Sequence, residues 1–109
     1  MAIKTNLIVD QGANFVYNIY LIDAAGDPFP LTDYTANAQI RRSYTTYSYT
    51  TIDAFINAVA GVITLTMNSS TTSSLTNNRY VYDLELTSNT GIVSRIVEGY
   101  LTVNLGVTR

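Results

Sequence analysis

The sequence contains no cysteine, no histidine and no tryptophan. Without cysteine the chain can form no disulfide and offers no thiolate ligand to a metal. Without histidine it lacks the side chain that most often acts as a general base and most often binds metals. A serine or threonine nucleophile therefore has no ordinary base, and Lys4, the only lysine, lies near the N-terminus. We expect a protein that is not an enzyme and that has no catalytic residue, cofactor or metal site.

Charges and long apolar runs are also scarce. Six basic and eight acidic residues give a net charge of −2, and charged residues make up 13% of the chain. No basic excess is present to neutralise phosphates, so we expect no nucleic-acid partner. No stretch approaches the roughly 20 apolar residues of a membrane span, and the apolar residues 7–9 are too few for a signal-peptide core. We expect a protein that is made in the cytoplasm and has no membrane partner.

Neutral polar residues take the place of the missing charges. The 16 threonines, 8 serines and 10 asparagines account for 34 of the 109 residues, and tyrosine adds nine more. Threonine and tyrosine favour strands, whereas asparagine and serine favour turns. Burying a neutral hydroxyl costs less than burying an ion, so such a surface can pack closely against a partner. The composition indicates a β-protein suited to protein–protein contact, although an ordinary β-domain could also have it.

The hydrophobic positions repeat with a period of two along most of the chain, which predicts strands. Turn signals recur about every ten residues, as in β-sandwiches. One short helical turn is expected near residues 69–75, where a serine or asparagine can cap it and Leu75 can reach the core. The predicted fold is a single all-β domain over residues 1–109, an antiparallel sandwich of about seven strands with residues 1–6 as an extended N-terminal arm. The strands are expected near residues 7–9, 15–22, 34–41, 62–67, 79–87 and 92–105, with an ambiguous stretch at 52–57.

The last of these strands contains a glycine, Gly99, after Glu98. Glycine inside a strand often marks a bulge or a bend. We therefore expect an interruption at residues 98–99, with the two halves of the strand in different pairings.

Residues 43–51 form an uncharged stretch of serine, threonine and tyrosine. It is interpreted either as an edge strand or hairpin tip, or as a contact surface. Tyrosine offers a large rigid area, and the hydroxyls offer adaptable hydrogen bonds. Stacking on bases is a weaker alternative, because only two cations adjoin the stretch. The candidate partner-contact residues are Tyr44, Tyr47, Tyr49, Arg41, Arg42 and, in the N-terminal arm, Lys4.

Two patterns of acidic residues could form sites. Asp83 and Glu85 are two residues apart and share one face of a predicted strand, where they could serve acid–base chemistry or bind Ca²⁺. A polar stripe is the favoured interpretation, because Arg95 on the following strand could neutralise one of them. The segment 23–27 has too few acidic ligands for a cation loop and is interpreted as a turn between Asp23 and Asp27.

Several segments together carry a resemblance to a known family. They read LIVDQGANFVYNIYLID, DPFPLTDYTANAQIRRSY, AGVITLTMNSSTTSSL, NRYVYDLEL and RIVEGYLTVNLGVTR. In this order they resemble small virion proteins of tailed bacteriophages, similar to the immunoglobulin-like domain at the N-terminus of baseplate upper proteins. The resemblance covers nearly the whole chain, with residues 43–51 less typical. Its most specific pieces are turn and strand-packing signatures at residues 10–12, 31–36, 79–83 and 98–99.

The resemblance implies an immunoglobulin-like β-sandwich that serves as an assembly module in the virion. The expected function is that of a non-enzymatic structural protein of the phage tail or baseplate, multimeric in the particle and bound to other virion proteins. One alternative is a capsid decoration protein on the phage head. A second is a module that binds host-surface carbohydrate, for which tyrosine could stack on sugar rings; tryptophan is absent, and the sequence does not locate a carboxylate–aromatic cluster.

Overall fold

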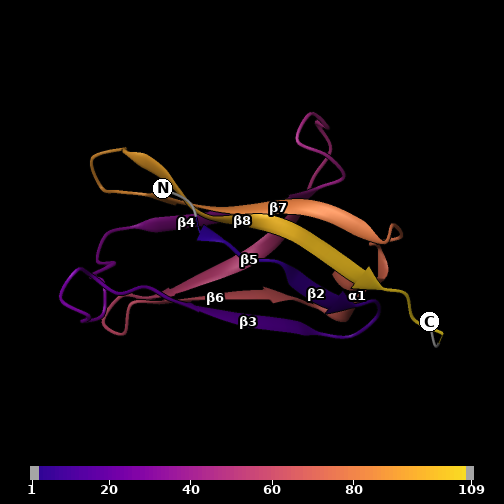
Figure 1. Ribbon diagram of the computed structural model, residues 1–109, viewed down its shortest axis with the longest axis horizontal. Coiled ribbons are helices and arrows are strands. Elements are labelled where there is room, and N and C mark those ends of the chain that lie inside the picture. The colour runs from indigo at the N-terminus through magenta and orange to yellow at the C-terminus, as the bar shows by residue number, and fades with distance from the viewer. Residues whose placement is uncertain (1–2, 108–109) are drawn as a thin grey trace.

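The computed structural model describes residues 3–107 and consists of eight strands and one short helix (Figure 1). The predicted all-β class is confirmed. Within residues 3–107 no helix is long and apolar enough to cross a membrane. The elements are β1 (Ile3–Lys4), β2 (Leu7–Asp10), β3 (Phe15–Tyr20), β4 (Thr35–Arg41), β5 (Thr50–Asn57), β6 (Val62–Met67), α1 (Ser69–Ser73), β7 (Arg79–Thr87) and β8 (Val93–Asn104).

The strands form one continuous curled sheet in the order β1-β8-β7-β4-β5-β6-β3, with β2 also beside β8. The prediction of a wholly antiparallel arrangement of about seven strands is wrong in one respect: there are eight strands, and β1 and β2 run parallel to β8, because the N-terminal segment docks on the free edge of β8. The curl occurs at β5, which changes partner along its length. Its first residues pair with β4 as far as Ile52, and from Asp53 onward it pairs with β6. In Figure 1, β5 runs diagonally from the layer of β4, β7 and β8 to the layer of β3 and β6. The two ends of the sheet therefore face each other.

The core lies between these facing parts and is built from alternating positions of the strands. Ile63 and Leu65 of β6 and Leu84 of β7 are completely buried. The predicted inward face of residues 79–87 is confirmed, because every second residue from Tyr80 to Leu86 is buried. The neighbouring outward positions Asp83 and Glu85 are half-buried.

The predicted helical turn is confirmed as α1. The Asn68 side chain caps it by accepting a hydrogen bond from the Thr71 amide at 2.9 Å, and Leu75 beyond its end is buried. The hydroxyl of Thr72, also buried, donates to the Ala13 carbonyl at 2.8 Å. The helix is thereby tied to the turn between β2 and β3.

The predicted bulge at residues 98–99 is wrong in its position. β8 is one unbroken strand, and its pairing with β7 shifts by one residue at Ile96. Leu84 pairs with Val97 and Glu85 with Arg95, so that Ile96 is the extra residue. Ile96 packs against the core, which supplies the physical reason for the bulge at this point.

Gly99 has a different role, at the other edge of β8. The parallel partner of β8 changes there from β1, which pairs with β8 up to Glu98, to β2, whose pairing with β8 begins at Leu101. The expectation that the two halves of this strand pair differently is therefore confirmed at this edge. Between the two, the backbone carbonyl of Thr5 lies so close to Gly99 that a Cβ atom would overlap it. Residues 3–6 of the predicted arm are thus extended and docked on β8, while residues 1–2 lie outside the described part of the chain.

Tyr82 holds residues 3–6 from the core side of the sheet. The ionisation of its hydroxyl provides a test of this contact. Its buried hydroxyl donates to the Thr5 carbonyl at 2.5 Å, and burial, with a smaller effect of Tyr17, raises its pKa well above the ordinary value. The folded state therefore keeps the phenol neutral where the unfolded chain ionises, and we expect stability to fall as pH rises above about 10. Denaturant unfolding at several alkaline pH values measures this loss.

The Tyr82→Phe variant should show a smaller alkaline loss than the wild type. At neutral pH it should lose about 0.5–1.5 kcal/mol from the missing hydrogen bond. The Tyr47→Phe variant is the control, because Tyr47 is almost fully exposed. Equal alkaline losses in the two variants would contradict this assignment.

Candidate functional site

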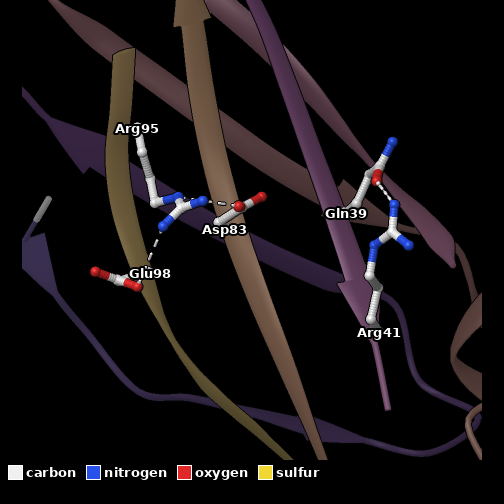
Figure 2. Close-up of polar contacts among 5 residues, drawn as sticks. All are labelled: Gln39, Arg41, Asp83, Arg95 and Glu98. Atoms are coloured by element: carbon white, nitrogen blue, oxygen red, sulfur yellow. Dashed lines mark hydrogen bonds and ion pairs between the residues drawn. The ribbon is translucent and has the colours of Figure 1, made fainter. Parts of the chain in front are cut away.

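The stretch between β4 and β5, residues 42–49, is a hairpin loop held by Arg41 at the end of β4. The Arg41 Nη1 atom donates to the carbonyl oxygens of Thr46 at 2.5 Å and Tyr47 at 3.0 Å. Its Nη2 atom donates to the Gln39 Oε1 atom at 3.0 Å (Figure 2). Its guanidinium carbon also lies 5.2 Å from the centre of the Tyr49 ring. One side chain therefore connects the loop to the outer face of the sheet.

The loop also has internal hydrogen bonds near its start. The Thr46 amide donates to the Ser43 carbonyl at 3.2 Å, and the two hydroxyls lie 2.8 Å apart. The predicted hairpin tip is confirmed, because residues 42–49 lie outside the strands while residues 50–51 belong to β5. Tyr44, Tyr47 and Tyr49 are 67%, 93% and 55% exposed. The loop thus presents three tyrosine rings from a fixed base.

A polar hollow of about 270 Å³ lies beside this loop on the outer face of β4 and β7. Strand alternation and register create it. Asn37 pairs with Glu85 and Gln39 with Asp83, so that their side chains form cross-strand rows. The residues that line it are Asn37, Gln39, Arg41, Tyr44, Val81, Tyr82, Asp83, Glu85 and Arg95.

Arg95 on β8 closes one side of the hollow through two ion pairs. Its Nε atom lies 3.2 Å from the Asp83 Oδ2 atom, and its Nη1 atom lies 3.9 Å from the Glu98 Oε1 atom (Figure 2). The predicted neutralisation of the Asp83–Glu85 pair by Arg95 is confirmed, with Asp83 as the partner. Across residues 3–107, no three acidic side chains gather closely enough to hold a metal ion.

The other candidate contact residues lie in different places. Arg42 adjoins a shallow hollow of about 140 Å³ on the other side of the loop, together with Tyr49 and Tyr80. Lys4 lies on β1 as the register partner of Glu98, so β8 and β7 separate it from β4 and the loop. The structure brings five of the six candidates together at the loop and places Lys4 apart. Whether they contact a partner stays a prediction.

Sequence reasoning did not identify Asn37, Gln39 or Glu98 as members of a site. All three occupy outward positions of their strands. For Asn37 and Gln39 the alternation of residues 34–41 was a signal in the sequence, and for Glu98 there was none. The pairing of β4 with β7 joins residues forty or more positions apart, and no local pattern in the sequence indicates it.

The segment 23–27 is a turn, as predicted. The Asp23 Oδ1 atom accepts hydrogen bonds from the backbone amides of Ala25 at 2.9 Å and Asp27 at 3.0 Å. This carboxylate oxygen therefore stabilises the turn itself.

Comparison with known proteins adds no family assignment to this geometry. No protein-family model and no curated protein sequence matches the chain.

Proposed function

We propose that this protein is a non-enzymatic structural component of a bacteriophage virion, an assembly module of the tail or baseplate. Two points support this proposal: the sequence resemblance and one structural observation. The loop of residues 42–49 holds Tyr47 93% exposed while Arg41 fixes the backbone on either side of it. A preordered aromatic contact loses little conformational entropy when a partner covers it.

The shape of the sheet supports the finer part of the proposal, an immunoglobulin-like sandwich. The part containing β4, β7 and β8 faces the part containing β3 and β6 across one core, and β5 pairs with strands of both. Within the described chain, β3 pairs with β6 alone, and it carries no charged residue or proline. An uncharged edge strand of this kind can pair with a strand of a neighbour. Virion symmetry would then add many weak contacts together.

The variant Tyr47→Ala tests the loop as the contact. Its melting temperature should stay within about 2 °C of the wild type, since an exposed substitution costs little stability. Its incorporation into phage particles should fall at least severalfold, because the most exposed ring of the contact is gone. Immunoblotting of purified particles, with the variant supplied in place of the wild-type protein, measures incorporation.

Phe55→Ala is a matched control, because Phe55 is 62% exposed on the part of β5 that pairs with β6, away from both the loop and the β3 edge. Normal incorporation of the Phe55→Ala protein with reduced incorporation of the Tyr47→Ala protein supports the loop as the contact. Reduced incorporation of the Phe55→Ala protein alone would move the contact to that part of β5. Unfolding of Tyr47→Ala would mean that the loop belongs to the folded core, and the assignment would be wrong.

A further inference from the structure

The polar hollow on the outer face of β4 and β7 contains groups that are not used within the protein. Glu85 is half-buried, and Asn37 is its cross-strand partner in register. Within residues 3–107, neither side chain makes a hydrogen bond or an ion pair, and the Gln39 amide uses only its oxygen, toward Arg41. The hollow therefore presents a carboxylate acceptor, one complete amide and one amide donor from two adjacent strands.

The remaining charged groups of the hollow compensate one another. Two guanidinium groups, from Arg41 and Arg95, face two carboxylates, from Asp83 and Glu85. Asp83 is paired with Arg95 at 3.2 Å, and Arg41 donates to loop carbonyls and to Gln39. This balance favours neither an anion nor a cation as ligand. The ion pair and the hydrogen bonds hold the walls in place before a ligand arrives.

Tyr44 adds an aromatic surface to this polar lining. It lines the hollow from the loop, and its side chain is 67% exposed. An aromatic ring beside convergent carboxylate and amide groups suits a ligand with an apolar face and a polar rim. The volume of about 270 Å³ is close to the lower limit of small-molecule sites, about 300 Å³, which matches a ligand of one or two rings.

We propose that this hollow is a binding site for a neutral saccharide of one or two pyranose rings. Adjacent sugar hydroxyls each donate and accept, and so can bond the Glu85 carboxylate and the amides of Asn37 and Gln39 together. The C–H face of the ring would pack on Tyr44. The site shares Tyr44 and Arg41 with the loop of the proposed assembly contact but does not include Tyr47, so substitutions at Tyr47 and at Asn37 test the two assignments separately.

Amide NMR titration of the whole protein with glucose, galactose, N-acetylglucosamine and lactose tests the site. We expect at least one sugar to bind weakly, with Kd on the order of 1 mM. The side-chain amide signals of Asn37 and Gln39 and the backbone signals near Glu85 should shift most. No shift with any of the four sugars would overturn the proposal, as would shifts that cluster elsewhere on the molecule.

Variants distinguish the proposed contacts from non-specific ones. Glu85→Ala should weaken binding about tenfold or more, since a hydrogen bond to a charged group is lost, and Asn37→Ala should weaken it about two- to tenfold, since its amide is neutral. Glu85→Gln keeps the shape of the side chain and should also weaken binding, which covers the case in which Glu85→Ala fails to fold. Asn14→Ala, an exposed asparagine outside the hollow, and Tyr47→Ala should bind like the wild type.

Two further results would count against a saccharide site. Unchanged affinity in both the Asn37 and the Glu85 variants would show that the sugar does not contact them. Sodium phosphate or sodium sulfate shifting the same signals at lower concentration than any sugar would identify an anion site, driven by the two arginines, in place of the neutral one.

Discussion

Replacing Leu84 by alanine should lower the free energy of unfolding by about 2–5 kcal/mol. Leu84 is completely buried in β7, and its register partners are Ala38 of β4 and Val97 of β8, both buried as well. With the small Ala38 side chain beside it, the cavity left by the missing atoms has little nearby material to fill it. Urea unfolding measures this loss. It is large compared with the free energy of unfolding of a typical domain, roughly 5–15 kcal/mol.

Leu105→Ala is the matched control for this substitution. Leu105 follows β8 and is 52% exposed, so the same change should cost less than about 0.5 kcal/mol. A loss at Leu84 no greater than that at Leu105 would contradict the placement of β7 at the centre of the core.

Gly99→Ala should destabilise the protein by about 1–3 kcal/mol and loosen β1. The new Cβ atom would overlap the carbonyl of Thr5, which also accepts the hydrogen bond from Tyr82. The atom that would be overlapped belongs to the backbone, so the rotation of a side chain cannot relieve the overlap. Segment 3–6 must move away from β8, and the hydrogen bond from the Thr5 amide to the Glu98 carbonyl must lengthen or break.

Hydrogen exchange at the Thr5 amide reports this local change directly. We expect it to speed up in Gly99→Ala more than the loss of global stability explains. Gly91→Ala is the control, because Gly91 has a positive φ but no atom within 4 Å of its Cβ position, so its cost is backbone strain alone. If both variants leave Thr5 exchange unchanged, Gly99 does not make room for the arm.

The strands that alternate clearly could be predicted from the sequence, and features that depend on distant contacts could not. Residues 62–67 and 79–87 were predicted as strands with their buried faces, because alternation is a local property of the chain. The role of Gly99 depends on Thr5, more than ninety residues away, so local reasoning attributed the glycine to a bulge. The true bulge at Ile96 carries no glycine and gave no local signal.

The candidate site divides in the same way. The tyrosines of the loop were identified because residues 43–51 are unusual in composition. The part played by Arg41 requires the path of the loop, which returns the carbonyls of Thr46 and Tyr47 to the guanidinium group. The hollow requires the strand order, because Glu85 lies beside Asn37 only when β7 pairs with β4.

Immunogold electron microscopy of purified phage particles, with an antibody against this protein, tests the proposed function most directly. We expect gold at the tail or at its tip, in a regular position from particle to particle. Gold spread over the head would identify a decoration protein and contradict the tail or baseplate assignment. Absence of gold from every part of the particle, with the protein soluble in the lysate, would contradict the structural function itself.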